Sequence, residues 1–204
     1  HGTNRRQRQM CIRDRLCRYL DMPFQHISDP VLKKMNRKIT RKEIEATMAR
    51  VRRKLPDVAW RTTFIVGFPT ETDQDFEELV DFVSEGHFQH LGIFLYSDED
   101  NIRSSKFGDP IPLSLKEERK NRLMEIQQKI SREHHQKMVG SLQQVLVGGF
   151  SSETDLLLEG RNQYQGPEVD GVVYINEGNA TSAGFHQVEI TEAHEYDLVG
   201  KILN

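Results

Sequence analysis

The chain has 204 residues, of which 36% are hydrophobic, and its formal net charge is −3. This length and hydrophobic content can supply the core of one large or two small domains. No apolar run approaches the roughly 20 residues that a membrane-spanning helix needs, and two cysteines cannot form a disulfide framework. The composition therefore excludes membrane-spanning and disulfide-stabilised secreted proteins, and we expect a soluble, cytoplasmic protein.

The charge is unevenly distributed along the chain. Residues 1–56 contain 16 Lys/Arg and 5 Asp/Glu, whereas residues 57–204 contain 12 and 26. A basic end can form a nucleic-acid-binding surface, but solvated helix faces explain the same excess more simply. Within the basic part, residues 1–16 are rich in Arg and Gln and have no hydrophobic period. We interpret them as a foreign or artefactual segment joined to a truncated gene, and we leave them out of the fold prediction.

Residues 17–112 alternate between short apolar strands and amphipathic helices. Helix starts are predicted at Asp29-Pro30 and by the capping boxes Thr40-x-x-Glu43 and Thr72-x-x-Asp75. Apolar runs predict strands at residues 19–22, 61–66 and 91–96. The alternation of strand and helix predicts a parallel sheet with right-handed crossovers.

A long helix and a region of short strands follow. Ser114-x-x-Glu117 predicts the cap of a helix that reaches about Val139 and ends at Gly140. Beyond it, five short apolar runs separated by Gly, Asn and Asp predict a small antiparallel barrel. The predicted domains are thus residues 17–112, a connecting helix at 113–139, and a barrel at 140–204.

The most informative segment runs from Arg61 to Thr72, where a buried strand, a turn containing Gly67 and Pro69, and a capped helix follow one another. In α/β folds, ligands bind at the carboxyl ends of the strands. A glycine there allows the backbone to approach a ligand closely. Spacing alone leaves an ordinary strand-to-helix turn equally possible.

Several segments resemble the radical S-adenosylmethionine methylthiotransferases. They are YLDMPFQHISD at residues 19–29, RTTFIVGFP at 61–69 and FLYS at 94–97. GR at 160–161, PEVDG at 167–171 and EYDL at 195–198 resemble the family's C-terminal TRAM domain. The resemblance covers about Cys17 to Leu203. It implies an α/β plus all-β chain, in which the C-terminal part of a radical SAM partial (β/α) barrel precedes a five-stranded antiparallel, OB-like TRAM barrel.

The resemblance also implies that the strand ends bind S-adenosylmethionine beside an iron–sulfur cluster, while it assigns no catalytic residue. The positions that it assigns to cofactor binding are Gln25, His26, Ser28, Gly67, Phe68, Pro69, Tyr96 and Ser97. His26 is equally compatible with a helix-capping or core histidine, and Tyr96 with a buried core side chain. Arg61 begins its predicted strand, so we leave it out of the site.

The cluster ligands of the family are missing. Radical chemistry on S-adenosylmethionine needs three thiolates, which the family supplies as CxxxCxxC, and a second cluster is bound by another domain. Cys11 and Cys17 do not match this spacing. Histidines could replace cysteines as cluster ligands, but we expect the pairs His87/His90 and His134/His135 to be surface residues instead. We therefore predict no metal site in the chain and a fragment that is inactive by itself.

One branch of the family modifies an aspartate of the twelfth small-subunit ribosomal protein, and another modifies tRNA. Residues 140–204 contain two basic and ten acidic side chains, which would repel phosphates and attract a basic protein. Gln25-His26 also resembles the first branch, whereas Asn101–Arg103 departs from the family's Gly-Thr-Pro-like pattern. We expect a monomeric fragment of a ribosomal-protein methylthiotransferase. The alternatives are a tRNA methylthiotransferase fragment and a non-catalytic TRAM-containing binding module.

Overall fold

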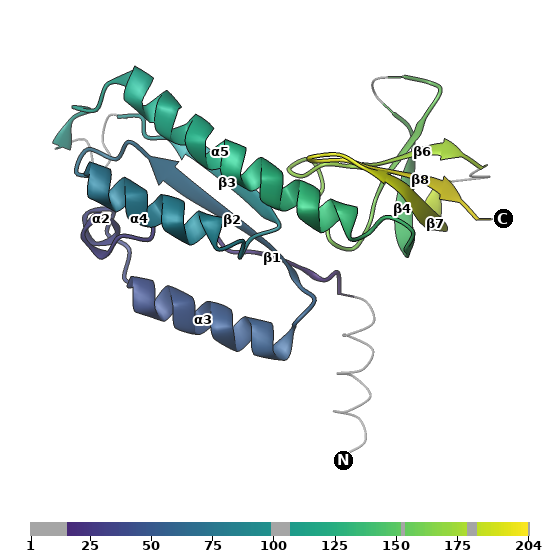
Figure 1. The fold of residues 1–204 in the computed structure, drawn as a ribbon, viewed down its shortest axis with the longest axis horizontal. Coiled ribbons are helices and arrows are strands. Elements are labelled where there is room, and N and C mark those ends of the chain that lie inside the picture. Colours follow the sequence, from purple (N-terminus) through teal and green to yellow (C-terminus); the bar gives the residue numbers. More distant parts are fainter. Residues whose placement is uncertain (1–15, 99–106, 152–153, 179–182, 204) are drawn as a thin grey trace, which may run out of the picture.

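The computed structural model describes residues 16–98, 107–151, 154–178 and 183–203 (Figure 1). Residues 1–15, which make up all but the last residue of the segment predicted to be foreign, lie outside these ranges. The divergent Asn101–Arg103 also lies outside them. Within them, the chain forms a parallel sheet with its helices and a separate barrel, joined by one long helix (Figure 1). No helix in these ranges combines the length and hydropathy needed to cross a bilayer.

The sheet consists of β1 (Tyr19–Asp21), β2 (Ala59–Val66) and β3 (His90–Leu95), in the order β1-β2-β3 and parallel throughout. The helices α2 (Asp29–Lys34) and α3 (Arg41–Lys54) connect β1 to β2, and α4 (Asp73–Ser84) connects β2 to β3. The predicted parallel sheet is confirmed. Both capping boxes are also present, with Thr40 and Thr72 each accepting a hydrogen bond from the third helical residue.

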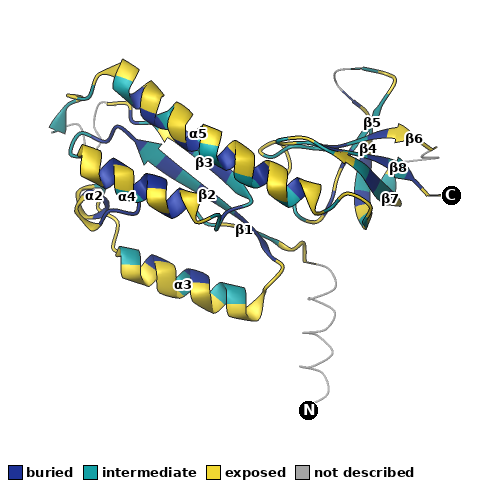
Figure 2. Cartoon of the chain, in the orientation of Figure 1, coloured by how far each residue is buried: buried dark blue, intermediate teal, exposed yellow. Residues whose placement is uncertain are grey.

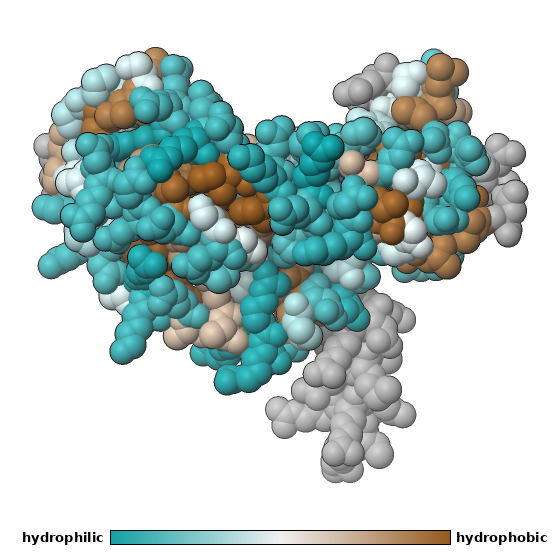
Figure 3. All heavy atoms as spheres, in the orientation of Figure 1, coloured by the Kyte–Doolittle hydropathy of each residue, from teal (hydrophilic) through white to brown (hydrophobic). Residues whose placement is uncertain are grey.

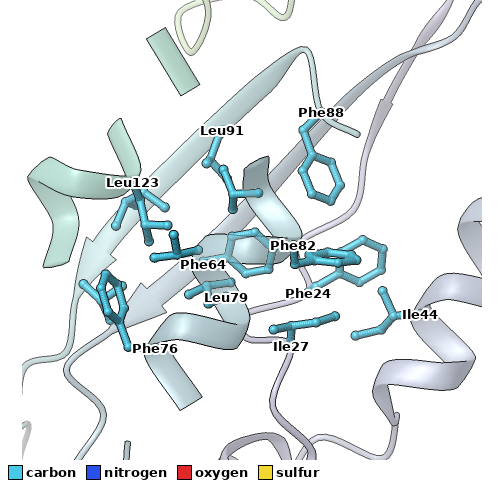
Figure 4. Close-up of a cluster of buried hydrophobic side chains, with 14 of the residues drawn as sticks. Phe24, Ile27, Ile44, Phe64, Phe76, Leu79, Phe82, Phe88, Leu91 and Leu123 are labelled. Carbon is cyan, nitrogen blue, oxygen red and sulfur yellow. The ribbon is translucent and has the colours of Figure 1, made fainter. Parts of the chain in front are cut away.

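One face of the sheet carries the main core. Side chains of β2 alternate in burial, because successive residues of a strand point to opposite faces. Trp60, Phe64 and Phe88 pack there with Leu79 and Phe82 of α4 (Figure 4). The buried stripes of α3 and α4 continue this core (Figure 2). The sequence predicts a buried strand here, but Ile65, on the opposite face of the sheet, is only half-buried.

The long helix α5 spans Leu113–Gln136 and differs at both ends from the prediction. Pro112 occupies the N-cap position and its carbonyl accepts hydrogen bonds from Leu115 and Lys116, so Ser114 already lies inside the first turn and cannot cap the helix. At the other end, the helix stops three residues before Val139. Gly140 then has a φ of +81° and donates its N–H to Ile190 of the barrel.

The barrel contains β4 (Leu142–Phe150), β5 (Leu158–Arg161), β6 (Val173–Glu177), β7 (Gly184–Ala193) and β8 (Leu198–Ile202). It closes in the order β4-β5-β6-β8-β7 around a valine- and isoleucine-rich interior. The predicted number of five strands is confirmed, although the second begins only at Leu158, where the prediction ended. The all-antiparallel arrangement is wrong, because β6 and β8 pair in parallel. The long hairpin of β7 and β8 brings β8 back beside β6 in the same direction.

The barrel lies at the end of the sheet where the strands begin, and the strand arrows point away from it (Figure 1). Asp170 joins the two parts: its carboxylate accepts hydrogen bonds from the Tyr19 hydroxyl and from Nη1 of Arg61, both at 2.7 Å. His90 Nε2 donates to the carbonyl of Tyr164 at 2.8 Å. The Asp170 side chain is 2% exposed, so this contact is a buried one.

Candidate functional site

The carboxyl edge of the sheet brings together the three segments predicted to bind the cofactor. Gln25 extends the edge beside β2, donating its N–H to Thr63 and accepting one from Ile65. Gly67 follows β2 directly, and Tyr96 follows β3 and donates its N–H to Val66 at 2.9 Å. Segments that lie far apart in the sequence therefore end side by side.

Two of these residues have a left-handed backbone. Gly67 has a φ of +76°, which a glycine adopts without strain. Gln25 has a φ of +73°, where a side chain is costly and the surroundings must enforce the conformation. Such outliers concentrate at functional sites, and no sequence pattern predicted this one.

The close approach predicted at Gly67 is made by a lysine of this chain. A Cβ atom added to Gly67 would overlap the Lys116 side chain, with Cδ at 2.7 Å. The Lys116 ammonium donates to the carbonyl of Tyr96 at 2.8 Å and to the carboxylate of Asp109 at 2.5 Å. Gly67 thus makes room for a buried cation that ties α5 to the ends of β2 and β3.

A fully buried carboxylate holds the turn after β2. Glu71 Oε2 accepts the backbone N–H groups of Gly67 and Phe68, at 2.7 and 3.2 Å. Its Oε1 accepts from Nη1 of Arg119 at 2.8 Å. Burial raises the pKa of Glu71, while Arg119 and the two N–H groups act against that rise.

Sequence reasoning missed Glu71, Lys116 and Arg119. The two cations could have been predicted from helical spacing. Lys116 and Arg119 lie seven and four residues before Leu123, which places them on the same face of α5 as the apolar stripe that contains Leu123. That face is predicted to be buried. A cation at a buried helical position needs a partner. The sequence could not have identified that partner, which lies 48 residues away from Arg119.

His26 is a core histidine. The side chain is fully buried, and its Nδ1 accepts the N–H of Ser28 at 3.0 Å, which assigns the proton of the neutral ring to Nε2. Burial lowers the pKa of His26 to about 4. Nε2 lies 3.8 Å from Glu71 Oε2 and has no hydrogen-bond partner within the described ranges. The Ser28 hydroxyl, for its part, donates to Asp75 of α4.

The remaining predicted residues line the outer part of this edge. The rings of Phe68 and Tyr96 meet edge to face at 5.2 Å and pack on Val31 in a small apolar cluster. Pro69 is half-buried, as is Gln25, and Ser97 is exposed. The structure thus brings all eight predicted residues to one edge. Their contact with a cofactor stays a prediction.

The residues that the structure describes do not fit an iron–sulfur cluster. Cys17 is exposed and precedes β1, at the opposite edge of the sheet. No group of three His, Cys, Asp or Glu side chains suited to a metal ion occurs in the part of the chain that the structure describes. The edge does fit a polar organic ligand, because Gln25 and Ser97 keep accessible polar side chains there.

Two of the histidines expected on the surface lie between the sheet and the barrel. His135 is 5% exposed and its Nδ1 donates to the carbonyl of His194 at 3.0 Å. The His90 side chain is 11% exposed and faces Asp170. The expectation of exposed histidines is wrong at these two positions, because the barrel covers them.

Two protein-family models match the chain. That of the radical SAM superfamily matches residues 12–83, and that of the TRAM domain matches residues 139–203. The first match begins inside the segment that we interpret as foreign, and this interpretation stays a prediction.

Curated relatives match nearly the whole chain. It is 50% identical over 189 residues to the ribosomal protein uS12 methylthiotransferase RimO of Bdellovibrio bacteriovorus, covering 93% of this chain and 41% of the relative. The proteins of the same name from Geobacter sulfurreducens and Desulfotalea psychrophila are 44% and 45% identical over 190 and 195 residues, covering 93% and 96% of this chain. The chain spans 42% and 44% of their lengths. The chain is thus similar to the C-terminal region of the radical SAM methylthiotransferases.

Proposed function

We propose that the chain is the C-terminal region of a methylthiotransferase that modifies ribosomal protein uS12. The observation that carries the proposal is the identity of 44–50% to uS12 methylthiotransferases over at least 93% of this chain. A ribosomal substrate would place the protein in the cytoplasm.

The carboxyl edge of the sheet would contribute to S-adenosylmethionine binding. When bound to a complete enzyme, this cofactor supplies the methyl group and the radical. We assign direct contact to the edge residues that keep accessible surface, which are Gln25, Pro69 and Ser97. Buried His26, Ser28 and Phe68 would hold these residues in position. The Phe68–Tyr96 pair would exclude water from this edge.

The barrel would bind the protein substrate. Its acidic excess favours a basic partner over a phosphate backbone, and one of its two basic residues, Lys201, is paired with Glu189 at 3.3 Å. Phe150, Leu156 and Phe185 are exposed on the barrel, where apolar side chains reach the surface (Figure 3). The barrel lies at the opposite end of the sheet from the carboxyl edge, where the cofactor would bind. It would therefore hold a part of the substrate protein that is remote from the reacting aspartate.

A chimera tests the enzymatic proposal. The C-terminal region of the Bdellovibrio bacteriovorus relative is replaced by residues 17–204 of this chain, and uS12 is analysed by mass spectrometry. We expect a gain of one methylthio group. A chimera that folds and binds its clusters but leaves uS12 unmodified would contradict the proposal.

A binding assay separates the two alternatives. We expect the 204-residue chain to bind isolated uS12 in a salt-sensitive manner and to ignore tRNA. Glu177→Lys with Glu192→Lys should weaken this binding about tenfold, whereas Glu117→Lys with Glu118→Lys on α5 should not. Preference for tRNA would favour the tRNA branch. Binding of uS12 combined with an inactive chimera would favour a non-catalytic binding module.

A further inference from the structure

A cavity of about 370 Å³ lies at the amino edge of the sheet, where β2 and β3 begin and the end of α5 meets the barrel. Its walls combine apolar side chains with cations and amides. Its lining includes Arg52, Val58, Lys137, Asn162, Gln165 and Leu198. The cavity is separated from the carboxyl edge of the sheet by the length of β2, which is about 25 Å at the usual rise per residue.

Two buried amides in this wall have unused hydrogen-bond donors. Asn162 Oδ1 accepts the N–H of Tyr164 at 2.9 Å, and Gln165 Oε1 accepts the N–H of Asn162 at 3.0 Å. These bonds fix the orientation of both amides, since the opposite orientation would place an NH2 group against a backbone N–H. Asn162 and Gln165 are 4% and 6% exposed, and their NH2 nitrogens are without partners among the described residues.

The cations of the cavity also lack carboxylates. The half-buried Arg52 guanidinium donates to the carbonyls of Val58 and His87, at 2.8 and 2.6 Å, and forms no ion pair within the described part of the chain. Lys137 is exposed at the rim, also without an ion pair in these ranges. Asp57, the one carboxylate of the wall, is paired with Arg18 at 2.9 Å. The cavity therefore presents donors and positive charge.

We propose that this cavity is a binding site for a small organic oxyanion, a phosphate or carboxylate group carried on an apolar body. Buried donors without acceptors cost free energy, and an oxyanion would offer these amides acceptors. Arg52 and Lys137 would balance its charge. The apolar body would lie against Val58 and Leu198. The volume falls within the usual range of small-molecule sites.

The experiment is an NMR titration of the 15N-labelled 204-residue chain with three probes that share one ring. Phenyl phosphate and benzoate carry the two candidate oxyanions, and phenol is the uncharged control. We expect both NH2 signals, of Asn162 and of Gln165, to shift with at least one oxyanion and to stay in place with phenol. The stronger oxyanion identifies the phosphate or carboxylate class. No shift with either oxyanion, or equal shifts with phenol, would overturn the proposal.

Isosteric variants test the two donors directly. Asn162→Asp and Gln165→Glu keep the oxygen that accepts a backbone N–H but replace each free donor by an acceptor. Each should weaken oxyanion binding about tenfold or more. Because a new buried charge can disturb folding, Lys137→Gln provides a second test on an exposed residue, with an expected loss of about threefold. Lys129→Gln, on α5 and outside the cavity, should change nothing. Unaltered binding in Lys137→Gln, or in a folded Asn162→Asp, would count against the site.

Discussion

The two edges of the sheet differ in how their buried polar groups are satisfied. At the carboxyl edge, the buried charges Glu71, Lys116 and Arg119 find partners within the chain. At the amino edge, two buried amides keep free donors, and the cations beside them have no carboxylate partner among the described residues. Both edges adjoin α5 and both contain a buried nitrogen without a partner in these ranges, but only the carboxyl edge pairs its buried charges within the chain. Burial alone therefore does not show whether a charged side chain stabilises the fold or is available to a ligand; its partners must also be known.

The largest expected effect comes from breaking the charge pair of the carboxyl edge. Arg119→Met leaves Glu71 buried without its cation and should lower the free energy of unfolding by about 3–5 kcal/mol. The control is Arg122→Met: Arg122 also lies over the Phe76 ring, but its pair with Glu77 is exposed and should cost about 0–1 kcal/mol. Urea unfolding measures both. Equal losses would show that the carboxyl edge is not held by this pair.

The packing of Gly67 against Lys116 gives the next effect. Gly67→Ala adds a clash with the lysine stem to the cost of a left-handed backbone, and should destabilise by about 3 kcal/mol. Gly86→Ala is the matched control, because Gly86 has a φ of +72° with open space around its Cβ position, and should cost about 1 kcal/mol. Chemical denaturation of both variants gives the difference. If Gly67→Ala lowered the free energy of unfolding no more than Gly86→Ala, the Lys116 side chain would move aside at little cost and would not fix this edge.

Acidification tests the buried histidine of the carboxyl edge. The pKa of His26 is about 4 in the fold against 6.5 ordinarily, so between these pH values the unfolded chain takes up a proton that the folded chain does not. The free energy of unfolding should therefore fall as the pH drops from 6.5 to 4, by about 2–3 kcal/mol from His26. Above pH 6.5 this contribution is complete.

Other groups titrate in the same range, so a variant isolates His26. The raised pKa of Glu71 acts in the opposite sense, since its folded form holds a proton longer. His26→Asn keeps an acceptor for the Ser28 N–H and should flatten the pH dependence, whereas His87→Asn at an exposed position should not. Thermal unfolding across this pH range measures the slopes. An unchanged slope in His26→Asn would show that His26 is not the group responsible.

The smallest effect concerns the contact between the sheet and the barrel. Asp170→Asn keeps one acceptor oxygen for Tyr19 or Arg61 but removes the charge, and should cost about 1–3 kcal/mol. Burial and the bond to Asp170 raise the pKa of Tyr19, so its phenol should ionise at lower pH in the variant. Titration followed by ultraviolet absorbance detects this shift. A Tyr19 that titrates unchanged would indicate that the barrel does not fix this edge.

Local patterns predicted more of this molecule than long-range ones. Thr40 and Thr72 were found as caps because each motif lies within four residues. The start of α5 was misplaced because Pro112 provides a helix start that does not need a side-chain cap. The parallel pairing of β6 and β8 could not be read from periodicity, since it depends on β8 closing the barrel against β6 after its hairpin with β7.

The prediction of the candidate site was limited in the same way, because contacts between residues distant in sequence could not be predicted. The strand-end residues were located because parallel strands end at a common edge, a rule that needs only strand order. The partners of Glu71 and the buried state of His135 depend on contacts between elements distant in sequence, and the resemblance to a family carried no information on them. The free amides at residues 162 and 165 lie in a turn without regular structure, where no sequence pattern predicts burial.

The helix α5 has one further consequence. Its first turns carry Lys116 and Arg119 at the carboxyl edge, and its last turn carries His134 and His135 at the cavity, so a single rigid rod of 24 residues touches both. If a ligand at one end changes the affinity for a ligand at the other end by moving this rod, the second ligand must change the affinity for the first by the same factor. Two measurements of binding, each made with and without the second ligand, would therefore have to give the same coupling constant.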